Sequence, residues 1–342
     1  MWRFRHQLCL ALWAALLTAC GGSGGSPTNP TTPPPPPSYT VTATVFYDEN
    51  ENGRLDPEER GRIPGVQVVI GSASATSAPL TGQAIVSGIP EGPAAVGVNL
   101  GTVPAYFQVK QVPSIQVPGP AEVQIPLTLE IGGNHPNLYL GLGDSITKGD
   151  GSSDGLGYMN KLQALLRGQL GVADVRTWGR SGTNSAEGAS VTRKTLRWYY
   201  PAYTLILYGT NDWQECKNPD PRLCYTIDSL RSMVEDVKSW DSLPVLATIL
   251  PANPTIAPRE RNEWIDSTNL LIKAMAHQEG AAVADLNAEF KAAADLPSLY
   301  SDDIHPNDAG YEVLAQGWVK GITGARSTTA SSRHPFGFSF GR

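Results

Sequence analysis

The sequence lacks the surplus of basic residues that nucleic-acid-binding proteins carry. Among its 342 residues, 26 Lys and Arg side chains are outnumbered by 32 Asp and Glu side chains, so the formal net charge is −6 at pH 7. A protein that binds nucleic acid needs basic side chains gathered on one face to neutralise phosphates. We therefore expect no nucleic-acid partner. The composition is otherwise ordinary for a soluble protein.

The N-terminal apolar stretch is too short to span a bilayer. Residues 8–17 follow Arg3 and Arg5 and fall short of the ~20 apolar residues of a transmembrane helix. A basic start and a short apolar stretch are typical of a signal peptide. The stretch ends in Leu-Thr-Ala-Cys, which resembles the bacterial lipobox. This implies a lipoprotein signal peptide over residues 1–19 and acylation of Cys20. An ordinary signal peptide with a chance cysteine, or an uncleaved anchor, is the alternative.

The segment after the signal peptide is built from Gly, Ser and Pro. Within residues 20–37, Gly-Gly-Ser repeats follow Cys20 and continue into a proline-rich run. Gly/Ser segments are flexible and polyproline is stiff, so together they form a tether that holds a domain off a surface. We expect an exported lipoprotein anchored to the membrane through Cys20. Gly21 stands where many inner-membrane lipoproteins have Asp, which favours the outer membrane or the cell surface.

Cysteine is scarce, with four in the whole sequence. Signal cleavage removes Cys9 and acylation occupies Cys20, which leaves Cys216 and Cys224. Two cysteines close together in an exported protein favour a disulfide that closes a short loop. Two free thiols are the alternative, and nothing around the pair indicates a metal site.

Residues 38–132 predict a small all-β sandwich. Short runs of β-branched and apolar residues are separated by Pro and Gly with no helical periodicity, which is the pattern of short strands joined by turns. The runs are residues 40–47, 65–70, 84–86, 95–98 and 122–127. No aromatic platform in this region argues for carbohydrate binding.

Residues 48–59 have the spacing of a calcium-binding EF-hand loop. Counting from Asp48, oxygen-bearing side chains stand at positions 1, 3, 5, 9 and 12, with Gly at position 6. The loop follows a predicted strand, and with residues 61–68 it resembles the B-type repeat domains of bacterial surface adhesins, which are related to prealbumin-like sandwiches. We expect a structural Ca²⁺; a solvated acidic turn is the alternative. The predicted ligands are Asp48, Asn50, Asn52, the backbone carbonyl of Arg54, Asp56 and Glu59.

The pattern changes at residues 131–136, and residues 136–324 form a second predicted domain. Apolar strand-like runs at 138–142, 175–178, 204–208, 245–250 and 282–285 alternate with helical patterns at 158–170, 227–240, 259–278 and 308–320. Continuous apolar strands with crossover helices predict a parallel sheet covered on both faces. The active site of such a sheet lies at the carboxyl ends of its strands.

Four polar blocks stand at or near these strand ends, and they supply what acyl transfer needs. A nucleophilic Ser145 needs a base with a pKa near 7, which His305 supplies, and a carboxylate that fixes the imidazole tautomer. Asp302 has the better spacing for that carboxylate, and Asp303 is the alternative. The blocks are Gly-Asp-Ser at 143–145, Trp-Gly-Arg-Ser-Gly at 178–182, Gly-Thr-Asn-Asp at 209–212 and Asp-Asp-Ile-His-Pro-Asn at 302–307.

In order and approximate spacing, the four blocks resemble those of the SGNH hydrolases, the GDSL esterase superfamily. The resemblance covers the whole second domain and implies a flavodoxin-like α/β/α sandwich with a five-stranded parallel sheet, and catalysis without a cofactor. It makes Ser145 the nucleophile, His305 the base and Asp302 the residue that orients it. The oxyanion hole would comprise the backbone N–H groups of Ser145 and Gly179 and the side-chain amide of Asn211. One departure is Thr177, where the family often has Asn.

We therefore expect an exported serine esterase that hydrolyses carboxylic esters through an acyl-serine intermediate. Display on a tether outside the cell favours an acetylated polysaccharide as substrate. A lipase, lysophospholipase or thioesterase of the same fold is the enzymatic alternative. A surface-binding lipoprotein with a vestigial hydrolase domain is the non-enzymatic one. The Ser- and Thr-rich residues 325–342 predict a disordered tail.

Overall fold

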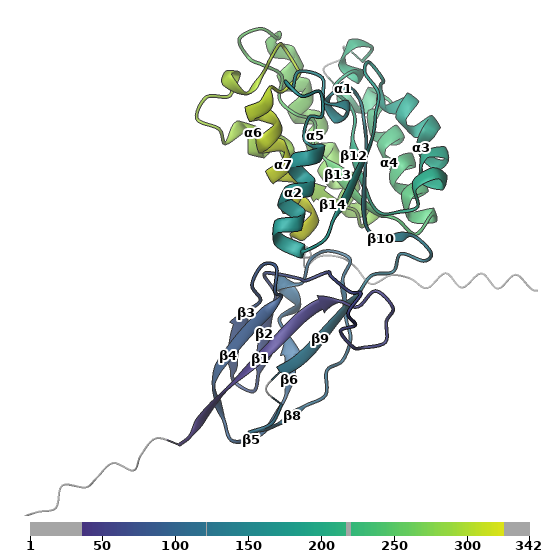
Figure 1. Cartoon of the computed structure of the whole chain (residues 1–342). Helices are drawn as coiled ribbons and strands as arrows, with labels where there is room; N and C mark the ends of the chain where they lie inside the picture. The colour runs from purple at the N-terminus through teal and green to yellow at the C-terminus, as the bar shows by residue number, and fades with distance from the viewer. Residues whose placement is uncertain (1–35, 121, 217–219, 325–342) are drawn as a thin grey trace, which may run out of the picture. The chain divides into compact units, whose positions relative to one another are not determined.

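The structure is a computed structural model that describes residues 36–120, 122–216 and 220–324 (Figure 1). The predictions for the signal peptide, for Cys20, for nearly all of the linker and for the C-terminal tail concern residues outside these ranges. Within them, no helix is both long enough and apolar enough to cross a membrane.

The predicted β region is all-β, as expected. A four-stranded sheet has the order β4-β1-β9-β7, in which β1 (Ser38–Tyr47) pairs antiparallel with β4 (Gln83–Pro90) and parallel with β9 (Glu122–Thr128), and β9 pairs with β7 (Gln108–Val109). In β4, Ala84, Val86 and Ile89 are buried and the residues between them are exposed, which is the pattern of a sheet with one face on a core. The smaller sheets are β3-β2-β6, made of Ala73–Thr76, Gln67–Ile70 and Val96–Val98, and β5-β8, made of Gly92–Ala94 and Ile115–Val117.

The second region contains the predicted five-stranded parallel sheet, in the order β11-β10-β12-β13-β14. Every residue of β12 and β13 is buried, because helices cover both faces and leave the strands no solvated side. The strands are β10 (His135–Gly143), β11 (Asp174–Gly179), β12 (Pro201–Leu207), β13 (Leu243–Ala247) and β14 (Ala282–Ala284).

Successive residues of the strands face two separate cores. Leu205 and Leu207 pack in the core that also contains residues of α2 (Met159–Leu170), α6 (Leu286–Lys291) and α7 (Asp308–Thr323). Ile206 packs in the other core, with residues of α3 (Ser185–Tyr199), α4 (Thr226–Ser239) and α5 (Arg259–Glu279). Figure 1 shows α2 and α7 on the side of the sheet opposite α3 and α4. The region is thus an α/β/α sandwich, as predicted.

Helix α3 has no counterpart among the helices expected from sequence. Its buried face consists of small and hydroxyl-bearing residues together with a single leucine, so it shows almost none of the large apolar residues that usually mark such a face. The helix starts instead from a capping box, in which Asn184 Oδ1 accepts a hydrogen bond from the Glu187 N–H and the Glu187 carboxylate accepts one from the Asn184 N–H. A sheet-facing helix can therefore lack the pattern by which such helices are recognised.

Candidate active site

Ser145 lies where β10, an inner strand of the five-stranded sheet, turns directly into the short helix α1 (Ser145–Lys148). Asp144 caps that helix, because its Oδ1 accepts a hydrogen bond from the Ile146 N–H at 2.9 Å. The turn leaves no room for a side chain at Gly143, where a Cβ would lie 2.0 Å from Thr147 Oγ1 and 2.6 Å from the Leu207 carbonyl oxygen. Ser145 is consequently held at the carboxyl edge of the sheet by rigid backbone.

A continuous line of hydrogen bonds joins Ser145 to His305 and Asp302. His305 Nε2 lies 2.8 Å from Ser145 Oγ, and His305 Nδ1 lies 2.7 Å from Asp302 Oδ2. With Nδ1–H donated to the carboxylate, Nε2 carries the lone pair that faces the hydroxyl. This arrangement can remove a proton from Ser145.

Asp302 is fixed by the turn to which it belongs. Its Oδ1 accepts hydrogen bonds from the backbone N–H groups of Ile304 at 2.9 Å and His305 at 2.7 Å. Burial alone raises the pKa of Asp302, but these bonds and the contact with the imidazole outweigh burial and hold the pKa below its usual value. The carboxyl is therefore ionised at neutral pH. Asp303, the alternative considered from sequence, points elsewhere, and its Oδ2 lies 3.1 Å from Arg261 Nη1.

Asn211 follows β12 and is supported by the buried residue after it. The Asn211 Nδ2 group donates to the Thr183 carbonyl at 2.8 Å and lies 3.5 Å from Asp144 Oδ2. Asp212 accepts hydrogen bonds from the Ser185 N–H and hydroxyl and from the Thr226 hydroxyl. The second amide hydrogen of Asn211 has only the long contact to Asp144, so it is the one that can turn to a substrate oxygen.

The structure argues against Gly179 as a free oxyanion donor. Its N–H donates to Thr177 Oγ1 at 3.1 Å, and a Cβ at Gly179 would lie 2.2 Å from the Lys148 N atom. The Thr at position 177 therefore takes up the very N–H that the sequence comparison assigned to the oxyanion. Gly179 allows α1 to pack closely on β11.

Gly182, which the sequence analysis did not single out, has an N–H that is open to solvent. It is exposed, has φ +80°, and its N–H has no hydrogen-bond partner within the described ranges. The next residue, Thr183, accepts the hydrogen bond from Asn211 Nδ2, which places Gly182 beside that amide. A second glycine in the same block was the available signal, but spacing does not tell which N–H is left free.

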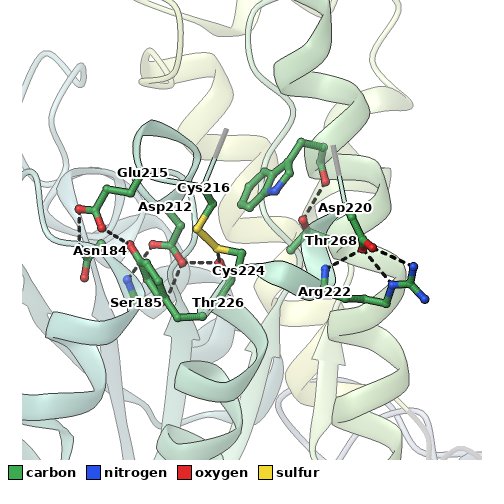
Figure 2. The surroundings of a disulfide bond; sticks show 12 residues. Asn184, Ser185, Asp212, Glu215, Cys216, Asp220, Arg222, Cys224, Thr226 and Thr268 are labelled. Carbon is green, nitrogen blue, oxygen red and sulfur yellow. Dashed lines mark hydrogen bonds and ion pairs between the residues drawn. A yellow bond between two sulfur atoms is a disulfide. The ribbon is translucent and has the colours of Figure 1, made fainter. Parts of the chain in front are cut away.

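The predicted disulfide between Cys216 and Cys224 is confirmed, with Cα atoms 5.5 Å apart. Figure 2 shows it beside Asp212 and Thr226. The Cys216 N–H donates to the Asp212 carbonyl at 2.8 Å, and Cys224 Sγ lies 3.0 Å from Thr226 Oγ1. The bridge thus closes a loop against the same polar group that supports Asn211.

The predicted calcium loop is folded upon itself. The buried Asp48 carboxylate accepts hydrogen bonds from the N–H groups of Asn52 at 3.1 Å and Gly53 at 2.9 Å. The side-chain amides of Asn50 and Asn52 both donate to Asp56 Oδ2, at 2.7 and 2.6 Å. The predicted ligands therefore converge. Across the described ranges, however, no group of three or more His, Cys, Asp or Glu side chains is arranged to hold a metal ion.

The remaining predicted ligands lie at the two sides of the same loop. Gly53 has φ +78° and open space around it, as the sharp turn at position 6 requires. Glu59 Oε1 accepts a hydrogen bond from the Glu49 N–H at 2.8 Å, and Arg54 donates its N–H to Asn52 Oδ1 at 2.7 Å. The Asn50 and Asn52 side-chain oxygens already accept backbone hydrogen bonds, from the N–H groups of Asn52 at 3.0 Å and Arg54 at 2.7 Å.

The fold and the hydrogen-bonded Ser145, His305 and Asp302 are what a serine hydrolase on an α/β/α sheet requires. The sequence matches the model of the GDSL-like Lipase/Acylhydrolase family over residues 142–313, half of the chain. The protein belongs to this family and is a carboxylic ester hydrolase of the SGNH type. The family and the class of reaction expected from the four blocks are thereby confirmed.

The solved structures to which this chain is similar match little more than half of its length. TesA is 25% identical over 54% of this chain and 97% of its own, with a TM-score of 0.45. An acetyl xylan esterase from Geobacillus stearothermophilus is 22% identical over 57% and 97%, with a TM-score of 0.46. The lipase/acylhydrolase from Enterococcus faecalis is 18% identical over 55% and 96%, with a TM-score of 0.44. Comparison with curated proteins gives no match.

Proposed function

We propose that this esterase acts through an acyl-Ser145 intermediate and removes acetyl groups from carbohydrate outside the cell. The observation that carries the catalytic part is the unbroken line from Asp302 through His305 to Ser145, with contacts of 2.7 and 2.8 Å. Ser is a weak nucleophile at its free pKa, and this line supplies the base that it needs.

In the first half-reaction His305 Nε2 takes the proton from Ser145 Oγ as the oxygen attacks the ester carbonyl. Asp302 stabilises the imidazolium that forms. The Ser145 N–H, the Asn211 side-chain amide and the Gly182 N–H bind the oxyanion, with Gly182 in the place first assigned to Gly179. His305 then gives the proton to the departing alcohol, and water attacks the acyl-serine by the same route.

A polar cluster beside the nucleophile supports a hydroxyl-rich substrate. Lys148 Nζ lies 2.9 Å from Asp150 Oδ1 and 3.0 Å from Ser181 Oγ. The Asp150 N–H donates to the Ser145 carbonyl at 2.9 Å, so the cluster adjoins the nucleophile. The next residue packs beside the base, since a Cβ at Gly151 would lie 3.0 Å from His305 Cβ. Exposed donors and acceptors at this position suit the hydroxyls of a sugar better than an alkyl chain.

Two substrate series test this proposal. We expect the protein to release acetate from acetylated xylo-oligosaccharides and to prefer p-nitrophenyl acetate to the palmitate ester. The Ser181→Ala variant should lower kcat/KM on the oligosaccharide by about tenfold, the scale of one lost hydrogen bond, and leave p-nitrophenyl acetate unaffected. Ser190→Ala, on the outer face of α3, is the matched control. A strong preference for the long acyl chain would remove the carbohydrate proposal in favour of a lipase.

We propose further that the β region holds a structural Ca²⁺ in residues 48–59. The ligands would be the side chains of Asp48, Asn50, Asn52, Asp56 and Glu59 and the carbonyl of Arg54. A hard cation prefers such oxygen ligands, and its binding would stabilise this small region without taking part in hydrolysis.

Membrane attachment through Cys20 completes the proposed function. It rests on the lipobox-like sequence and on the Gly/Ser- and Pro-rich segment that follows. Expression of the wild type and of Cys20→Ala with labelled palmitate tests it. Label and membrane association in the wild type alone are expected, and equal partitioning of both proteins would contradict the anchor.

A further inference from the structure

Arg261 is a buried cation that the reaction steps described above do not use. It lies in the first turn of α5, and only 3% of its side chain is exposed. Burying a guanidinium is unfavourable unless partners replace the lost water. The contacts of Arg261 therefore indicate which parts of the structure its burial stabilises.

The guanidinium joins two loops that are far apart in sequence. Its Nη1 atom lies 3.1 Å from Asp303 Oδ2, and its Nη2 atom donates to the Thr210 carbonyl at 3.0 Å. Asp303 is adjacent to Asp302, and Thr210 is adjacent to Asn211. One side chain thus touches the neighbour of the orienting carboxylate and the neighbour of the oxyanion donor.

Each loop also has an anchor of its own. The Asn253 N–H and side-chain amide donate to the carbonyls of Asp303 and Asp302, at 2.8 and 3.3 Å. The carboxylate of Asp212 ties the other loop to Ser185 and Thr226. Across the described residues, Arg261 is the side chain hydrogen-bonded to both loops. The buried Nε of Arg261 has no hydrogen-bond partner among these residues. The guanidinium is thus placed to reach both loops even though one of its N–H groups stays unpaired.

We propose that Arg261 is a positioning residue, which holds the loop of Asn211 and the loop of Asp302 and His305 at the separation that the transition state needs. The inference rests on the proposed function of those residues. Base and oxyanion donor act on opposite sides of one carbonyl group, and a displacement of about 1 Å between catalytic groups can lower the rate by ~10²-fold. Arg can make this link because its planar guanidinium directs separate N–H groups at two acceptors. The Lys ammonium is a single point charge and lacks this geometry.

The test compares Arg261→Met and Arg261→Lys by steady-state hydrolysis of p-nitrophenyl acetate. We expect kcat to fall by roughly 10²-fold in the Met variant with KM changed by less than about threefold, because the loss is in the transition state and not in substrate binding. The Lys variant should recover part of kcat. Ile272→Ala is the matched control: the side chain is fully buried on the same helix, so its loss lowers the melting temperature without touching either loop.

Asp303→Asn keeps the proposal testable if the Arg261 variants do not fold, because this side chain is 43% exposed. We expect its kcat to fall by about tenfold, and the double variant with Arg261→Met to be no worse than Arg261→Met alone, since both act through one bridge. Equal kcat in folded Arg261→Met and wild type overturns the proposal, as does an equal loss of kcat in Ile272→Ala. Full activity of Ser145→Ala would instead overturn the proposed function itself.

Discussion

The active site and the calcium loop are both clusters of Asp and Asn side chains, but they reach order in different ways. At the active site each carboxylate already has directed donors: Asp302 has the backbone of its own turn and the imidazole, and Asp212 has Ser185 and Thr226. In the loop, two side-chain amides turn to a single oxygen of Asp56. The carboxylates of the first cluster have donors that fix them, whereas the loop is the place where we propose that a cation binds.

The largest effect is expected from removing the nucleophile. Ser145→Ala should lower kcat on p-nitrophenyl acetate by about 10⁴–10⁶-fold, because no other group can form the acyl intermediate. The melting temperature should change little, since the hydroxyl contributes no core packing. Ser190→Ala on the surface of α3 serves as control. Comparable activity of the Ser145 variant and the wild type would refute the mechanism.

A smaller loss is expected at the oxyanion. Asn211→Ala removes one donor and should lower kcat by about 10²–10³-fold, or ~3–4 kcal/mol of transition-state stabilisation, with KM nearly unchanged. The measurement is steady-state kinetics on the acetate ester. If KM rises while kcat stays constant, Asn211 binds the substrate and not the transition state.

The calcium loop should respond to ligand where the active site does not. At Ca²⁺ about 100 times its Kd, the stabilisation should be about 2.7 kcal/mol. It should appear as a higher melting temperature that a chelator reverses and that Asp48→Asn abolishes. Esterase activity at 25 °C should be the same with and without chelator. A melting temperature insensitive to Ca²⁺ in the wild type would remove the metal from the β region.

The smallest effect concerns Asp144, the buried neighbour of Ser145. Burial raises the pKa of Asp144 to about 7, against the opposing hydrogen bond from the Ile146 N–H. Because the folded pKa exceeds the unfolded one, the contribution to stability is complete below about pH 4 and is lost as the pH rises through about 7. Asp144→Asn keeps the helix cap and does not titrate. Between about pH 4 and pH 7 the unfolding free energy of this variant should therefore fall by on the order of 1–3 kcal/mol less than that of the wild type.

Denaturant unfolding at several pH values measures that difference. The control is Asp228→Asn, whose carboxyl on α4 is 85% exposed. Identical pH dependence of the wild type and Asp144→Asn would show that the buried carboxyl is not the titrating group.

Sequence alone predicts those parts of the fold and site that follow from local pattern. Continuous apolar runs indicate the parallel strands, and a parallel sheet brings its strand ends to one edge, so Ser145 and Asn211 could be expected near each other. The Asp302–His305 pair is local, since a single turn makes both contacts. These inferences need only the order of the blocks and the rule for strand ends.

The features that could not be predicted from the sequence depend on contacts between residues that are distant in the chain. Whether Gly179 or Gly182 offers a free N–H depends on the Thr177 hydroxyl, which nothing in the spacing reveals. Arg261 looks like any charged residue at the start of a helix until the fold buries it against two loops. Helix α3 escaped because the sheet accepts its small and hydroxyl-bearing residues as a packing face.

The separation of Ser145 and His305 by 160 residues has a consequence for synthesis. Ribosomes make the chain from the N-terminus, so Ser145 is synthesised well before Asp302 and His305. The base and its carboxylate follow only just before α7, the last described helix. An incomplete nascent chain therefore contains a serine that cannot yet be activated. Hydrolytic capacity arises in one step, when the final part of the α/β/α region is added.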